Sequence, residues 1–104
     1  MIEIEIYEVD GLIRGFEVEG HSEYAEHGKD IVCAAISILS QTTLFTLLED
    51  YGPHCSYSKA DGYLEVEILD VDKLDELQLL FKAFKLGVLN VAEQFPKYVK
   101  LNLC

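Results

Sequence analysis

The feature that most constrains this chain is a run of eighteen residues, Ile31 to Leu48, that contains no charged side chain. The run is long enough to span a membrane. A third of it is nevertheless polar, namely Ser37, Ser40, Gln41, Thr42, Thr43 and Thr46. We therefore predict a helix buried on most of its circumference inside protein, not in lipid. Asp30 is a good N-cap for it, and Gly52-Pro53 should end it after about Asp50.

Alternating residues predict a strand hairpin before this helix. Isoleucine at positions 2, 4 and 6 alternates with Glu3, Glu5 and Tyr7, which is the period of a half-buried strand. Asp10-Gly11 then supplies a two-residue turn, because both residue types tolerate positive φ. The return strand should run from about Leu12 to Glu19. A second hairpin is expected after the helix, with strands at 54–59 and 63–69 around a turn at Ala60-Asp61-Gly62.

A second helix and a short last strand complete the expected elements. Asp72 should cap the helix, whose apolar residues keep helical spacing from Leu74 to Val91, and Phe95-Pro96 should end it. Residues 99–103 alternate again. The order β-β-α-β-β-α-β predicts an α+β fold, a two-layer sandwich with two helices packed on one face of a mainly antiparallel sheet. We expect one domain over residues 1–104.

Composition limits the partners and the compartment. The formal charge is −11, from 19 acidic and 8 basic side chains, and such a surface repels nucleic acid. No basic segment opens the chain, so no secretory signal is predicted, and a soluble cytoplasmic protein fits best. The first helix has more apolar surface than one small sheet can cover. We therefore expect a homodimer that buries the remainder.

The three cysteines, Cys33, Cys55 and Cys104, form no C-x-x-C pair. An odd number without such pairs argues against a disulfide framework and against structural zinc. His54 and Cys55, taken together with His21 and Cys33, make only a weak case for a metal site. We expect neither a metal nor a cofactor.

The residues around Asp30 suggest a thiol nucleophile. Cys33 would lie in the first helical turn, where free backbone N–H groups and the helix dipole favour a thiolate and could hold an oxyanion. His21 lies on the loop that leads into this helix and could act as base and then as acid. Asp30 could cap the helix or orient His21 as a third member of a triad. Equally, a cysteine before Ala34-Ala35 fits simple helix packing.

The loop from Gly20 to Lys29 is long and irregular, which is more typical of a functional segment than of a connection. His27 is a competing base or a solvated loop residue. Tyr24 could close on a substrate or hold the loop down. Gly20 and Gly28 could be turn formers or hinges of a lid.

The run from Gly20 to Ser37 resembles a known signature, G-H-x-x-Y-A-x-x-G-x-D-I-V-C-A-A-x-S, at every fixed position. This is the motif of the ribosomal-processing cysteine protease family, often called Prp, and the likeness extends loosely over the whole chain. It implies a homodimeric Cys/His protease. Family members remove the N-terminal extension of large-subunit ribosomal protein twenty-seven, after a pair of bulky hydrophobic residues.

By motif position, the resemblance makes Cys33 the nucleophile and His21 the catalytic histidine. We assign Gly20, Ser22, Tyr24 and Gly28 to a substrate loop, and the resemblance leaves the role of Asp30 open. The acidic surface would attract a basic ribosomal protein. Two other functions remain open: a non-catalytic acidic dimer that holds the precursor, and a redox sensor in which Cys55 or Cys104 resolves Cys33.

The last residues, Lys100-Leu101-Asn102-Leu103, resemble a K-L-N-L stretch that precedes the cut site in many leaders of the family's substrates. They could occupy the substrate groove, or they could simply complete the sheet as an edge strand. We expect the second arrangement.

Overall fold

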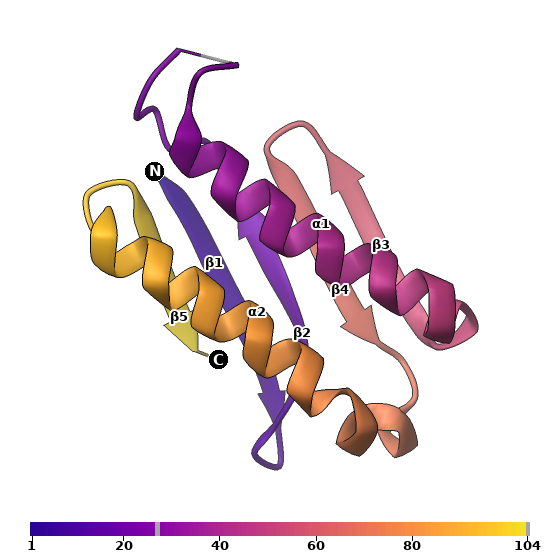
Figure 1. The fold of residues 1–104 in the computed structure, drawn as a ribbon. Helices are drawn as coiled ribbons and strands as arrows, with labels where there is room; N and C mark the ends of the chain where they lie inside the picture. The colour runs from indigo at the N-terminus through magenta and orange to yellow at the C-terminus, as the bar shows by residue number, and fades with distance from the viewer. Residues whose placement is uncertain (27, 104) are drawn as a thin grey trace.

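The computed structural model describes residues 1–26 and 28–103 as two helices on one five-stranded sheet (Figure 1). The sheet order is β3-β4-β2-β1-β5, and only β5 runs parallel to its neighbour β1. The predicted α+β sandwich is therefore confirmed. The elements are β1 (Ile2–Val9), β2 (Leu12–Glu19), α1 (Ile31–Tyr51), β3 (Cys55–Ala60), β4 (Tyr63–Ile68), α2 (Leu74–Gln94) and β5 (Val99–Leu103).

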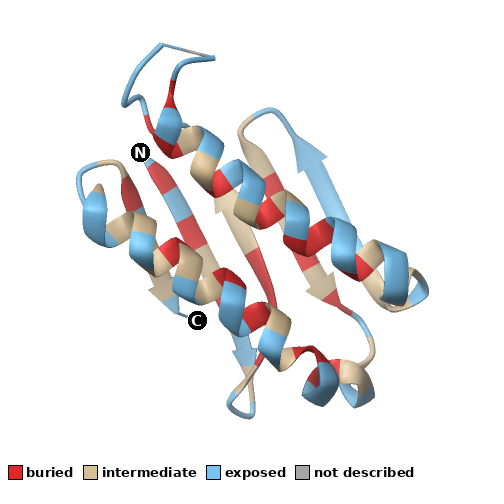
Figure 2. Ribbon diagram, in the orientation of Figure 1, coloured by how far each residue is buried: buried red, intermediate tan, exposed pale blue. Residues whose placement is uncertain are grey.

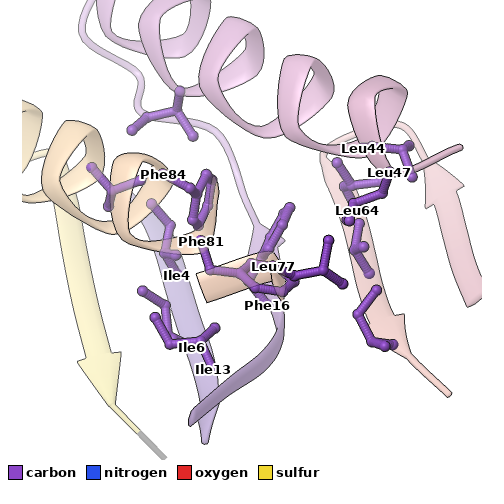
Figure 3. Close-up of a cluster of buried hydrophobic side chains, with 14 of the residues drawn as sticks. Ile4, Ile6, Ile13, Phe16, Leu44, Leu47, Leu64, Leu77, Phe81 and Phe84 are labelled. Atoms are coloured by element: carbon purple, nitrogen blue, oxygen red, sulfur yellow. The ribbon is translucent and has the colours of Figure 1, made fainter. Parts of the chain in front are cut away.

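The core lies between the helices and one face of the sheet. Figure 3 shows Phe81 and Phe84 of α2 above the isoleucines of β1, and Leu44 and Leu47 of α1 beside Leu64 of β4. Phe16 stacks on Phe84 with ring centroids 4.1 Å apart. Each large side chain buried here contributes about 1.5–3 kcal/mol. This core fixes α1 against the sheet and therefore fixes the position of its first turn.

Within one chain α1 is covered on one side only, so its predicted burial on most of its circumference depends on the second copy that the sequence predicts. Only 33% of its most apolar eighteen-residue window is buried, and Ile38 and Phe45 are 65% and 55% exposed (Figure 2). The physical reason is that the sheet and α2 together cover one side of the helix, and this chain supplies no third layer. By length and composition the segment Ile31–His54 could cross a membrane, a test that the core helix of a soluble protein also passes.

Two predicted boundaries need correction. Asp72 does not cap the second helix; instead Asp70 accepts the Asp72 N–H at 3.1 Å and caps a short 3₁₀ turn, Val71–Lys73, that leads into α2. His54 is not in a strand either. It ends a 3₁₀ turn, Gly52–His54, that follows α1. Both differences arise where aspartate or proline favours a tight turn between elements.

The predicted closing strand exists as β5, at the edge of the sheet beside β1. Val99 is buried, and Ile4 pairs with Leu101 in register. The K-L-N-L segment therefore completes the sheet in this structure.

The sheet face that points away from the helices is acidic. The register places Glu5, Glu17 and Glu65 side by side across three strands, and the Tyr7 hydroxyl donates to the last two at 3.2 Å each. Like charges opposite one another on neighbouring strands are unfavourable. Part of the negative charge of the chain thus lies on a face that has no part in the core.

Candidate active site

The backbone of His21 is held where three segments meet, at the end of the molecule that carries the β3–β4 turn (Figure 1). Its carbonyl accepts a hydrogen bond from the Met1 nitrogen at 2.7 Å. Its neighbour Gly20 donates to the Gly62 carbonyl at 2.8 Å. Gly20 has φ +100°, and a Cβ there would lie 2.4 Å from the Met1 carbonyl oxygen, so only glycine fits. The loop therefore leaves β2 in a fixed direction.

The imidazole ring of His21 lies against Gly62 in the β3–β4 turn. A Cβ at position 62 would lie 2.7 Å from the His21 Nε2, and Gly62 also has φ +68°. Glycine at position 62 thus allows the turn conformation and also leaves room for the His21 ring. The contact places His21 beside the turn while its side chain stays exposed to solvent.

Cys33 lies in the first turn of α1 and is half-buried. Its Sγ accepts the Ser22 N–H at 3.4 Å and lies 3.2 Å from the Ser22 Oγ. Cys33 and His21 both line a cavity of about 410 Å³ between α1 and the β3–β4 hairpin. The structure thus brings the two predicted residues to one cavity. Among the described residues, however, no hydrogen bond joins them.

Asp30 is the N-cap of α1, as predicted. One carboxylate oxygen accepts the N–H groups of Val32 and Cys33, each at 3.0 Å. The other accepts the Ser22 hydroxyl and the N–H groups of Tyr24 and Ala25. Burial alone would raise the pKa of Asp30, but hydrogen bonds from the Ser22 hydroxyl and from backbone N–H groups lower it to about 2. The carboxylate therefore binds the helix and the loop, and it makes no hydrogen bond to His21 within the described parts of the chain.

The expectation that the N–H groups of this helical turn hold an oxyanion is not met. Asp30 accepts the N–H groups of Val32 and Cys33 through its side chain and that of Ala34 through its carbonyl, at 3.0 Å. These donors are already used, because a capping aspartate competes for the same groups that an oxyanion would need.

Ser22 is the residue whose contacts were missed at the sequence level. It was assigned only to the substrate loop, yet it is 2% exposed and its hydroxyl lies between the Asp30 carboxylate and the Cys33 sulfur. Its position directly after His21 was the one available signal, and nothing in the spacing indicated that its side chain turns inward.

Tyr24 holds the loop down in this structure. Its ring packs edge-on against Phe95 and Tyr98, with centroids 5.3 and 5.2 Å apart. Gly28 has φ +87°, and a Cβ there would meet nothing within 4 Å, so backbone conformation alone favours glycine. His27, the competing base, lies outside the described residues.

The other histidine–cysteine pair is remote from the cavity. Cys33 is the third residue of the 21-residue helix α1 and Cys55 follows the end of this helix, so about 27 Å of helix, at 1.5 Å per residue, lies between them. A disulfide between these two cysteines is therefore impossible in this fold, and Cys104 lies outside the described residues. Residues 1–26 and 28–103 contain no group of three His, Cys, Asp or Glu side chains that could hold a metal ion.

The chemistry of the cavity suits an extended peptide. Apolar side chains from the sheet and from α1 line one part of it, namely Ile2, Val18, Ile36 and Leu64. Polar groups that could bind a backbone line the rest, including Ser37, Gln41 and Asp61. A thiol, an imidazole and an apolar wall are thus available to one bound chain.

The family model described as Cysteine protease Prp matches residues 1–100, so the chain belongs to this family. A relative from Bacillus subtilis (strain 168), named ribosomal processing cysteine protease Prp, is 29% identical over 96 residues, which is 88% of this chain and 82% of the relative. The protein of the same name from Staphylococcus aureus (strain NCTC 8325) is 26% identical over 95 residues, 89% of each chain.

Solved structures share the fold. SMU.848 from Streptococcus mutans has a TM-score of 0.79 and 33% identity, and the match covers 99% of this chain and 93% of that one. A ribosomal processing protease Prp from S. aureus, solved with a covalently linked product peptide, has a TM-score of 0.90 over the full length of both chains at 23% identity. The fold prediction and the family resemblance are both confirmed.

Proposed function

We propose that this chain is a cysteine endopeptidase in which Cys33 is the nucleophile and His21 is the general base and acid. The observation that carries the proposal is that both side chains line one cavity at the start of α1. His21 takes the thiol proton as the sulfur forms a bond to the scissile carbonyl carbon. It then gives this proton to the departing amine, which leaves an acyl-enzyme that water hydrolyses with His21 again as base.

The mechanism requires a rearrangement when peptide binds. In this structure the His21 ring rests on Gly62, and the Cys33 sulfur contacts Ser22. Catalytic hydrogen bonds often form only in the complex with substrate. Rotation of the exposed His21 side chain away from Gly62 would bring the imidazole to the thiol when peptide binds, while Ser22 stays in place.

The proposed substrate is the N-terminal extension of a basic large-subunit ribosomal protein. The names of the relatives from B. subtilis and S. aureus support ribosomal processing as the substrate class. The apolar part of the cavity suits bulky hydrophobic side chains before the cut. The net charge of −11 would speed encounter with a basic partner.

The working form in this proposal is a homodimer. The outer face of the helical layer carries four large apolar side chains that are all more than half exposed, Ile38, Phe45, Leu79 and Leu86. A second copy would remove this surface from water. Sedimentation equilibrium should give a dimer for the wild type and a monomer for Ile38→Asp combined with Leu79→Asp.

The alternative is an acidic protein that binds the precursor without cutting it. A precursor peptide incubated with wild type, Cys33→Ala or Cys55→Ala, and analysed by mass spectrometry, separates the two. We expect cleavage by the wild type and by Cys55→Ala and none by Cys33→Ala. Binding without cleavage by the wild type would favour the alternative. Cleavage by Cys33→Ala at the wild-type rate would remove the protease proposal.

A further inference from the structure

Ser22 contacts the sulfur of the proposed nucleophile through both its backbone and its side chain, although it occupies an open position of the family signature. Its backbone N–H points at the Cys33 sulfur at 3.4 Å, and its hydroxyl oxygen lies 3.2 Å from the same atom. It is 2% exposed, whereas the neighbouring loop residues His21, Glu23 and Tyr24 are exposed. A hydroxyl buried in a solvated loop and directed at sulfur calls for a chemical explanation.

The direction of each hydrogen bond follows from counting protons. A serine hydroxyl has one proton, and the Asp30 carboxylate next to it is ionised and can only accept. The Ser22 proton is therefore committed to Asp30, which leaves only lone pairs of the Ser22 oxygen facing Cys33. A neutral Cys33 can donate its S–H to this oxygen, whereas a thiolate would face it without a proton between them.

We propose that Ser22 is a positioning residue that holds Cys33 as an oriented, neutral thiol in the resting protein, through the chain Cys33 S–H to Ser22 O–H to the Asp30 carboxylate. The inference rests on the proposed function, because it concerns how the nucleophile of that site is kept. Cys33 loses its proton only when His21 approaches and takes it. The Ser22 N–H then remains as a donor to the thiolate.

The acceptor that Ser22 provides for the Cys33 S–H acts against the helix dipole. The helix dipole favours a thiolate at Cys33, whereas an acceptor for the S–H favours the thiol. The other charged or titratable groups around the two cavities that Cys33 lines are His21 and Glu23 of the loop, Asp30 of the cap, and Lys59, Asp61 and Tyr63 of the β3–β4 hairpin. Replacing Ser22 with alanine leaves all six in the chain, so it isolates the hydroxyl.

The test is the rate of Cys33 alkylation by iodoacetamide as a function of pH, followed on the Cys33-containing peptide by mass spectrometry. We expect the midpoint to fall by roughly 0.5 to 1 pH unit in Ser22→Ala, because the acceptor that favours the thiol is lost. Ser22→Thr retains a hydroxyl and should return the midpoint toward that of the wild type. Thr43→Val is the matched control: it removes another buried hydroxyl of the α1 region, one that bonds only to a backbone carbonyl at 2.8 Å. It should leave the midpoint unchanged.

An unchanged or raised midpoint in a folded Ser22→Ala protein would overturn the proposal, since the hydroxyl would then be structural or would serve the thiolate. If Ser22→Ala does not fold, the infrared S–H stretch of the wild type decides. The band that disappears in Cys33→Ala should lie at lower frequency than that of a free thiol, and a free-thiol frequency would contradict the inference. Neither readout uses peptide cleavage, so a failure here is distinguishable from a failure of the protease proposal.

Discussion

Within residues 1–26 and 28–103, a histidine, a cysteine and an aspartate come together at two places, and the first of these places lines a cavity. At the start of α1 the three are His21, Cys33 and Asp30; before α2 they are His54, Cys55 and Asp70. In the second group His54 and Asp70 contact each other at the surface, where His54 Nδ1 lies 3.4 Å from Asp70 Oδ2. In the first group Asp30 binds the helix and loop, and His21 and Cys33 face a shared cavity.

The two groups differ in where the cysteine lies. Cys55 begins strand β3, and burial raises the pKa of its thiol. Cys33 instead lies in the first turn of a long helix, beside a loop that leaves space for a ligand. Residue types at short spacing are therefore not sufficient for a reactive thiol, because the backbone around them determines access and charge.

The largest expected difference in activity is between variants of the two histidines, His21 and His54. His21→Ala should lower kcat/KM for the precursor peptide by 10² to 10⁴, as expected for the loss of a general base. His54→Ala should retain wild-type kcat/KM, because its ring pairs with Asp70 far from the cavity. Comparable losses in both variants would show that the two groups are not functionally distinct.

The next largest difference concerns two hairpin glycines. Gly62 and Gly11 both have positive φ, so alanine should cost each turn about 1 kcal/mol of stability. Only a Cβ at position 62 reaches the His21 ring. Because Gly62 lines the cavity in which this ring must reach Cys33, the extra Cβ of Gly62→Ala should reduce kcat/KM by roughly tenfold, and Gly11→Ala should not. Equal activities of the two purified variants would exclude Gly62 as the support for His21.

Replacing each of the two aspartates, Asp30 and Asp70, should lower the free energy of unfolding by different amounts. Asp30→Ala removes the acceptor for Ser22 and for four backbone N–H groups and should cost about 2 kcal/mol or more of unfolding free energy. Asp70→Ala removes one cap bond and a half-exposed contact with His54, for about 1 kcal/mol. Urea unfolding at neutral pH measures both, and a larger loss for Asp70→Ala would reverse the comparison.

The contribution of Asp30 to the free energy of unfolding should also depend on pH, and this effect should be smaller than that of Asp30→Ala. The pKa of Asp30 is lowered from 3.8 to about 2 on folding, so its contribution to stability is complete above pH 4 and disappears as the pH falls toward 2. The unfolding free energy of the wild type should therefore fall more steeply from pH 4 to 2 than that of Asp30→Asn. Parallel curves would mean that Asp30 is not the group that titrates.

Much of this could be predicted because it depends on local pattern. The alternation at Ile2, Ile4 and Ile6 and the Asp10-Gly11 turn determine the first hairpin, and Asp10 has φ 51° as a left-handed turn requires. The capping role of Asp30 also follows from its place before an apolar helix. The inward turn of Ser22 and the contact of His21 with Gly62 could not be predicted, because they join segments that are distant or irregular in sequence. That α1 has more apolar surface than one small sheet covers could also be predicted, whereas the residues left exposed, Ile38 and Phe45, depend on how the tertiary fold places α2.

The central claim is that Cys33, and not Cys55, carries the acyl group during cleavage. A quenched-reaction experiment tests this directly. Wild-type protein is mixed with precursor peptide, quenched in acid within one turnover, and digested for mass spectrometry. We predict that a thioester between the N-terminal product and the Cys33 sulfur appears and then decays with turnover. An acyl group on Cys55, or turnover with no acyl group on Cys33 at any time, would contradict it.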